Sequence, residues 1–126
     1  MNVLELFKPI TTFIFDVDGV LTDGTVLVLE NGLQARRMNI KDGFALQMAV
    51  QNGYKVLIVS GGNSPQVANR LEKLGITEIY MAVGDKKTFI TDYMKEPSRS
   101  ITISWLVNCS RRRSRRTVLP RGMDAA

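Results

Sequence analysis

The chain has 126 residues and a formal net charge of +5, which is the size of a single domain. It contains no histidine and one cysteine, Cys109, which excludes histidine-based catalytic triads, intrachain disulfides and zinc clusters. Any bound metal must therefore be a hard cation held by oxygen. The sequence has no apolar stretch near the ~20 residues of a membrane span and no signal-peptide pattern, so we expect a cytoplasmic protein without a membrane partner.

The positive charge is concentrated at the C-terminal end. Residues 98–126 contain seven arginines and one acid, a net of +6, whereas residues 1–97 contain ten basic and eleven acidic side chains, a net of −1. An argument for nucleic-acid binding therefore depends on the arginine-rich run at 111–116 alone. Because no aromatic platform for bases accompanies this run, we do not expect nucleic acid as a partner.

The N-terminal part of the chain predicts a buried strand followed by a hairpin. Residues 11–17 are β-branched, aromatic and apolar, which is typical of a buried strand that ends in a turn at Gly19. Two strand-like runs at about 25–30 and 33–40 flank Asn31-Gly32, and this dipeptide is the strongest short signal for a hairpin.

Helices and strands alternate after the hairpin. The expected elements, in chain order, are a helix over 42–53, a strand over 55–60, a helix over 61–75, a strand over 78–83, a helix over 85–95 and strand-like residues over 101–107. The first helix is expected to have Asp42 as its N-cap and an apolar face that includes Phe44 and Met48. This alternation predicts an α/β fold, a Rossmann-like parallel sheet in three layers.

Polar residues follow the ends of three successive strands of this predicted sheet. Asp16 and Asp18 follow the first strand, Ser60 and Gly61 end the second, and Lys86 comes shortly after the third. Ligands of parallel sheets bind at the carboxyl ends of the strands, so we expect these residues to face one crevice.

The chemistry of these residues suggests a phosphate site. Two neighbouring carboxylates repel each other and favour a cation such as Mg²⁺, and a serine with glycines before a helix can cradle phosphate. Lys86 opposes the helix dipole at its position, which favours an anionic partner. Each feature also has an ordinary interpretation, as a polar turn, a strand-to-helix turn or an exposed lysine. Their joint occurrence at three strand ends is more specific than any one of them.

Three motifs resemble those of the haloacid dehalogenase superfamily of aspartate-nucleophile phosphatases. They are FIFDVDGVLTDG at 13–24, VSGGNS at 59–64 and GDKK at 84–87. The hairpin in place of a large cap domain, together with MNIKDGFAL at 38–46, is similar to the capless branch that acts on phosphorylated 2-keto-3-deoxy sugar acids. In that branch the substrates are octulosonate 8-phosphate, of lipopolysaccharide biosynthesis, and nonulosonate 9-phosphate.

The resemblance implies a role for each candidate residue. Asp16 would be the nucleophile and Asp18 the general acid and base, with the Asp16 carboxylate and the Asp18 carbonyl as Mg²⁺ ligands. Ser60 and the Gly61 N–H would bind phosphoryl oxygens, and Lys86 would neutralise charge on phosphate and nucleophile. The hairpin at about 25–40 would assemble a homotetramer.

The sequence departs from the family after about residue 97. The family has a fourth, acidic motif after one more strand, but here Asn108-Cys109-Ser110 and arginines follow. We therefore divide the chain into a phosphatase-like core at 1–97 and a non-matching basic tail at 98–126. An altered reading frame, which would leave the C-terminal part of the fold incomplete, is the favoured interpretation, and a basic interaction tail is the other. Because this motif is missing, the second functional hypothesis is a catalytically impaired oligomeric module.

Overall fold

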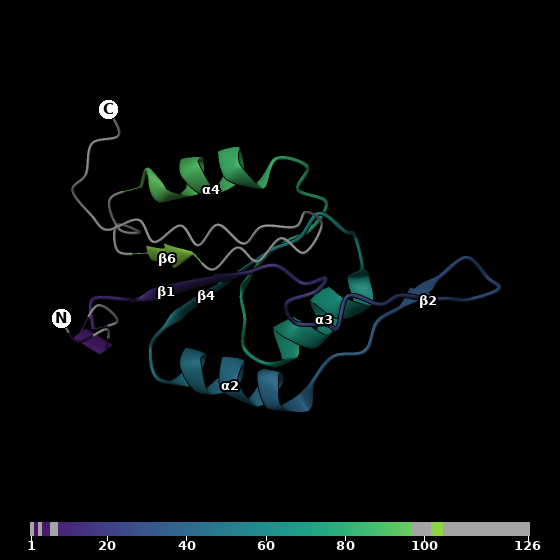
Figure 1. The fold of residues 1–126 in the computed structure, drawn as a ribbon, viewed down its shortest axis with the longest axis horizontal. Helices are drawn as coiled ribbons and strands as arrows, with labels where there is room; N and C mark the ends of the chain where they lie inside the picture. The colour runs from purple at the N-terminus through teal and green to yellow at the C-terminus, as the bar shows by residue number, and fades with distance from the viewer. Residues whose placement is uncertain (1, 3, 6–7, 97–101, 105–126) are drawn as a thin grey trace.

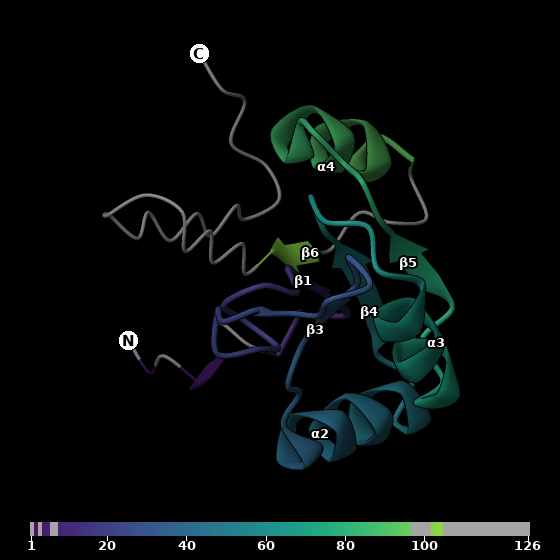
Figure 2. The same cartoon turned by 90° about the vertical axis from the view of Figure 1, so that its right-hand side faces the viewer.

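The computed structural model describes residues 2, 4–5, 8–96 and 102–104 of the chain. Its main sheet has four parallel strands in the order β5-β4-β1-β6. The strands are β1 Thr12–Phe15, β4 Lys55–Val59, β5 Glu78–Tyr80 and β6 Thr102–Ser104, and the helices are α2 Ile40–Gln51, α3 Pro65–Lys73 and α4 Lys86–Met94. Helices α2 and α3 lie on one side of the sheet and α4 lies on the other (Figure 1, Figure 2). The predicted three-layer α/β architecture is confirmed.

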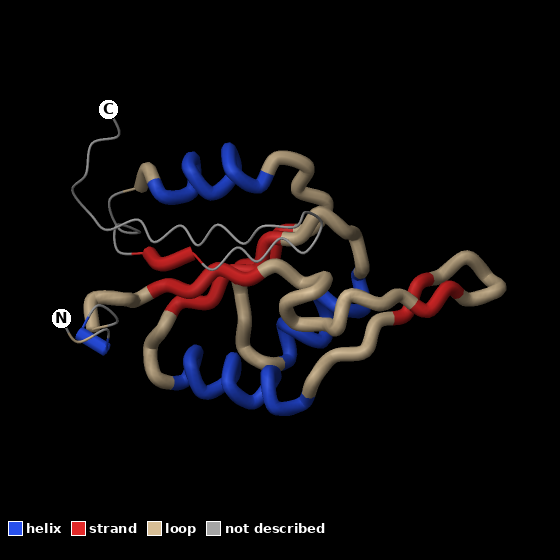
Figure 3. Tube along the Cα trace, viewed as in Figure 1, coloured by secondary structure: helices blue, strands red, loops and turns tan. Residues whose placement is uncertain are grey.

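The register of the sheet aligns the carboxyl ends of its strands. Strand β1 is the central reference: its Phe15 is opposite Ile58 of β4, and Val59 of β4 is in turn opposite Tyr80 of β5. All four strands run in the same direction, and the loops that leave β1, β4 and β5 therefore begin at one edge of the sheet (Figure 3).

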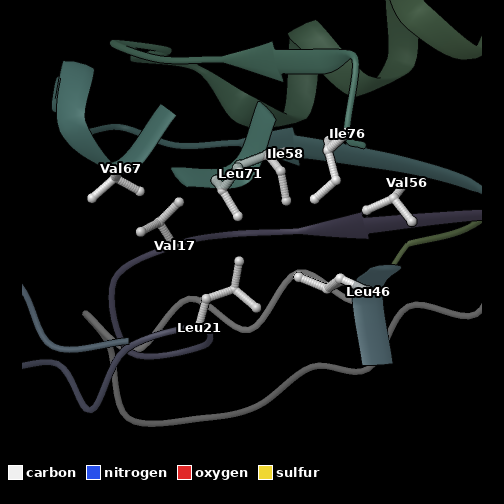
Figure 4. Close-up of a cluster of buried hydrophobic side chains, with 8 residues drawn as sticks. All are labelled: Val17, Leu21, Leu46, Val56, Ile58, Val67, Leu71 and Ile76. Atoms are coloured by element: carbon white, nitrogen blue, oxygen red, sulfur yellow. The ribbon is translucent and has the colours of Figure 1, made fainter. Parts of the chain in front are cut away.

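Strand β4 is buried on both faces and separates two apolar clusters. Val56 and Ile58 point into the cluster shared with α2 and α3, and Leu57 and Val59 point into the cluster shared with α4. Figure 4 shows the first cluster, which consists of Val17, Leu21, Leu46, Val56, Ile58, Val67, Leu71 and Ile76. A continuous apolar run is the expected sequence of a strand that is covered on both faces.

The predicted hairpin is present, although its strands are shorter than expected. Strands β2 Leu27–Val28 and β3 Gln34–Ala35 pair antiparallel, and the turn contains Gly32 with a φ of +82°. Only glycine adopts this backbone conformation without steric cost. The hairpin projects away from the carboxyl edge of the sheet (Figure 1, Figure 3), which is consistent with an insertion in place of a cap domain.

Helix α2 corrects two predictions. Its N-cap is Asn39, whose side-chain oxygen accepts the Lys41 N–H at 2.8 Å, so the predicted cap Asp42 lies inside the first turn instead. The predicted apolar face is wrong at Phe44 and Met48, which are exposed, while Gly43 and Leu46 are buried. A Cβ at Gly43 would be 3.2 Å from Arg70 Nη2 and 3.5 Å from Leu74 Cδ1, so the glycine allows this face of α2 to approach the end of α3 closely.

Part of the predicted C-terminal region can be compared with the structure. Strand β6, which falls within residues 98–126, pairs with β1 as an edge strand of the main sheet. Asn108-Cys109-Ser110 and the arginine run at 111–116 lie outside the described residues, so the predicted tail and its boundary stay predictions. Among the described residues, none of the helices is both long and apolar enough to span a lipid bilayer.

Candidate active site

Asp16 is a buried carboxylate immediately after the central strand β1. Its Oδ2 accepts a hydrogen bond from Lys86 Nζ at 2.7 Å, and its Oδ1 accepts the N–H of Val17 at 2.7 Å. The side chains of Asp16 and Lys86 are 7% and 16% exposed, respectively. A buried carboxylate is stable in its charged form when it is paired and hydrogen-bonded in this way.

Lys86 reaches Asp16 because helix α4 begins directly after the loop that follows β5. The N-cap of this helix is Asp85, whose carboxylate accepts the Thr88 N–H at 3.1 Å and the Thr88 hydroxyl at 2.7 Å. The Thr88 hydroxyl, followed by the backbone N–H, lowers the pKa of the exposed Asp85 carboxyl below its usual value. The cap fixes the first turn of α4, so the position of Lys86 is set by local sequence as well as by the sheet.

Asp18 forms a second ion pair, which the sequence analysis did not predict. Arg36 Nε donates to Asp18 Oδ1 at 2.6 Å, and Arg36 Nη2 lies 3.5 Å from Oδ2. Arg36 follows strand β3 where the hairpin returns to the domain. Consecutive residues of an extended chain point in opposite directions, but the pair Arg36-Arg37 does not indicate which arginine turns inward.

The loop after β4 lies between these two ion pairs. Ser60 is buried, and its backbone N–H donates to the carbonyl of Tyr80, while its Oγ accepts the N–H of Gly62 at 3.3 Å. A Cβ at Gly61 would be 3.9 Å from Lys86 Cε, and one at Gly62 would be 3.4 Å from Asp18 Oδ2. The two glycines therefore let this loop pass close to both ion pairs before it leads through Ser64 into helix α3.

The structure thus brings the five predicted residues to one edge of the sheet. A small pocket is lined there by Val17, Asp18, Arg36, Ser60, Gly62, Ser64, Val67 and Met81. The larger hollow of the fold is apolar and lies between β1 and α2, lined by residues such as Phe13 and Ala45, so it does not provide the polar chemistry of the strand ends. The catalytic and binding roles of the five residues stay predictions.

Comparisons with known proteins identify relatives of this chain in sequence and in fold. No family model matches the chain. The chain is 30% identical over 95 residues to the 3-deoxy-D-manno-octulosonate 8-phosphate phosphatase of Escherichia coli, covering 75% of this chain and 50% of the relative. The resemblance to the haloacid dehalogenase superfamily is confirmed. The chain spans about half the length of the curated relatives that it matches.

Solved structures agree with the sequence match. The 3-deoxy-D-manno-octulosonate 8-phosphate phosphatase of Moraxella catarrhalis, in complex with a magnesium ion, a phosphate ion and a KDO molecule, has a TM-score of 0.69 at 31% identity. That comparison covers 78% of this chain and 60% of the other. A haloacid dehalogenase superfamily hydrolase of Legionella pneumophila, of subfamily III A, has a TM-score of 0.69 at 33% identity, covering 74% of this chain and 51% of the other.

Proposed function

We propose that this chain is a Mg²⁺-dependent phosphatase of a phosphorylated 2-keto-3-deoxy sugar acid. The observation that carries the proposal is the buried Asp16 carboxylate, paired with Lys86 beside the Ser60-Gly61-Gly62 loop. The names of the relatives favour 3-deoxy-D-manno-octulosonate 8-phosphate as the substrate. Nonulosonate 9-phosphate is the second candidate, and a cytoplasmic location stays a prediction.

The proposed reaction has two phosphoryl-transfer steps. An Asp16 carboxylate oxygen forms a bond to phosphorus while the bond from phosphorus to the sugar oxygen breaks, and Asp18 gives its proton to that oxygen. Water then attacks the aspartyl-phosphate, and Asp18 takes a proton from this water as phosphate leaves and the Asp16 carboxylate is regenerated. Ser60, the Gly61 N–H and Lys86 bind the phosphoryl oxygens throughout and stabilise their charge.

The residues present fit a magnesium ion through a small set of oxygen ligands. The Asp16 carboxylate and the Asp18 backbone carbonyl would hold it, and Mg²⁺ commonly uses one or two carboxylates together with waters and substrate phosphate. Among the described residues, no group of three or more acidic, cysteine or histidine side chains could hold a metal. When bound, the metal offsets charge on the phosphoryl group.

The decisive experiment compares hydrolysis of the two sugar-acid phosphates and of p-nitrophenyl phosphate, with Mg²⁺ and with a chelator. We expect turnover with Mg²⁺ that Asp16→Asn abolishes, because this substitution removes the nucleophile and a metal ligand together. Asp92→Asn is the matched control, since Asp92 is an exposed carboxylate of helix α4 that lies outside the three motifs and pairs with Lys95. Turnover that persists in Asp16→Asn, or the absence of turnover in the unchanged chain, would refute the proposed function.

We also propose that the hairpin assembles copies of the chain into a homotetramer. Val28 is 70% exposed and Leu27 and Leu33 are also exposed, although all three are apolar. An isolated hairpin of two strands is marginally stable in water, so burial against other subunits would stabilise it. An oligomer without phosphatase activity would favour the alternative function, an impaired assembly module.

Light scattering at micromolar concentration tests this assembly. For the variant Leu27→Ser/Val28→Ser, the measured mass is expected to be that of a smaller oligomer or a monomer. The control Glu30→Ser changes an exposed polar residue of the same hairpin and should leave the mass unchanged. A monomeric unchanged chain would contradict the proposed assembly.

A further inference from the structure

The Asp18–Arg36 pair has an unusual distribution of exposure. The Arg36 side chain is 9% exposed, whereas the Asp18 side chain is 41% exposed. Ion pairs on a protein surface ordinarily have two hydrated partners. Here the guanidinium is enclosed and the carboxylate that it holds remains open to solvent, so Arg36 acts as a fixed support behind a reactive group.

The geometry of the pair fixes the orientation of the carboxylate. Both hydrogen bonds found for the Asp18 carboxylate within the described residues come from Arg36, one to each oxygen. A guanidinium is a planar fork that matches a carboxylate in two-point contact, so it fixes rotation as well as distance. Asp18 lies in the irregular segment between β1 and β2, where no helix or strand holds its side chain.

The pair also lies against the loop that is expected to bind phosphate. A Cβ at Gly62 would be 3.4 Å from Asp18 Oδ2, 3.5 Å from Arg36 Nη2 and 3.8 Å from Ser60 Oγ. Arg36 therefore holds the Asp18 carboxylate beside the Ser60-Gly61-Gly62 loop. Lys86 of helix α4 forms the corresponding ion pair with Asp16. Each of the two carboxylates is therefore paired with a basic side chain from a different part of the chain.

We infer that Arg36 is a positioning residue for proton transfer by Asp18, an inference that rests on the proposed function. It holds the carboxyl group in line with the oxygen that leaves phosphorus. In that step the bond from phosphorus to oxygen breaks, its electron pair stays on the oxygen, and the Asp18 proton moves to this oxygen. The hairpin thereby contributes to the chemistry of its own subunit through its returning strand.

Leaving groups that differ in their need for a proton test this inference. The p-nitrophenolate anion leaves without protonation, whereas a sugar alkoxide requires it. In Arg36→Met, which retains side-chain volume, we expect kcat for the sugar-acid phosphate to fall about 10- to 100-fold with little change in KM. The kcat/KM for p-nitrophenyl phosphate, which reports the first transfer step alone, is expected to remain within about 3-fold, because no proton is needed there, whereas kcat/KM for the sugar-acid phosphate falls with its kcat. Hydrolysis of the aspartyl-phosphate, in which Asp18 is the base, slows equally for both substrates.

Two further variants complete the comparison. Arg36→Lys keeps the charge without the fork and is expected to recover part of the lost kcat. Arg37→Met is the matched control, because Arg37 is the next residue and is exposed, and both activities are expected to be unchanged. If Arg36→Met does not fold, Arg36→Lys and Arg36→Gln are subjected to the same comparison of leaving groups.

A double-mutant cycle decides whether Arg36 acts through Asp18. In the Asp18→Asn background, Arg36→Met is expected to cause no further loss that is specific to the sugar-acid phosphate. An equal loss of kcat/KM for both substrates, a change in KM alone, or the full loss persisting in the Asp18→Asn background would each overturn the inference. These results leave the proposed function intact as long as Asp16→Asn abolishes turnover, whereas survival of turnover in Asp16→Asn refutes the function itself.

Discussion

Breaking the Asp16–Lys86 pair should lower the free energy of unfolding more than breaking an exposed ion pair would, because both side chains are largely buried. In Lys86→Met, the Asp16 carboxylate is left 7% exposed, with the Val17 N–H as its remaining described hydrogen-bond donor. Removing one partner of a buried pair typically costs 3–5 kcal/mol, and water at the Lys86 side, which is 16% exposed, reduces this. We therefore expect a loss of about 3 kcal/mol in the free energy of unfolding.

Removing the Asp16 carboxylate instead of the lysine should reduce the free energy of unfolding by less. Asp16→Asn leaves the Lys86 ammonium without its carboxylate, but a flexible lysine stem can turn its charge toward water. Combining both substitutions should recover much of the loss of Lys86→Met, because the double variant has no buried unpaired charge. Mg²⁺ should also raise the stability of Lys86→Met, since a bound cation neutralises Asp16 in the folded state.

Urea denaturation followed by circular dichroism measures these differences. Lys87→Met is the matched control, because Lys87 is the next residue of α4 and is exposed; it should change stability by less than about 0.5 kcal/mol. If Lys86→Met is as stable as the unchanged chain, or if the double variant simply adds the two single losses, the two side chains are not coupled and the reasoning is refuted.

Two further predictions concern the helix caps. Asn39→Ala should cost about 1 kcal/mol of stability in urea denaturation, and Asp42→Ala should cost less, because Asn39 is the capping residue of α2; the reverse order would contradict the assigned cap. The lowered pKa of Asp85 means that its ionised cap adds stability above the unfolded pKa of 3.8, and that this stability is lost as the pH falls through the lower folded value. Stability of the unchanged chain should thus fall more between pH 5 and about pH 3 than that of Asp85→Asn, and identical pH profiles would show that the ionised cap is not stabilising.

The helices and strands that follow a simple apolar pattern could be predicted from the sequence, and so could the polar residues at the ends of the strands. Asp16, Ser60 and Lys86 could be placed together because a parallel sheet brings the ends of β1, β4 and β5 to one edge, whatever the details of packing. The hairpin was found from Asn31-Gly32 because the turn itself requires a residue that tolerates a positive φ.

The missed features depend on contacts between distant segments. The direction of Arg36 follows from how the hairpin returns to the domain, which two short strands cannot fix by local pattern. The buried face of α2 was misjudged because Gly43, which has no side chain, allows this face to approach the end of α3 closely. Apolar spacing at Phe44 and Met48 correctly predicted a helix, but this exposed face does not contribute to the buried core of the described residues.

The phosphate-handling part of the candidate site is formed by residues 16–86. Its two ion pairs join residues that are 18 and 70 positions apart, so they form only when the β1 loop, the hairpin and α4 are in place. Neither ion pair includes a residue beyond 97, whereas the family's fourth acidic motif would come from that region. The two parts of the proposed chemistry therefore depend on different parts of the sequence. The proposed anion binding depends on residues of the core that the structure describes, and the proposed metal affinity depends on the few oxygen ligands that this core supplies.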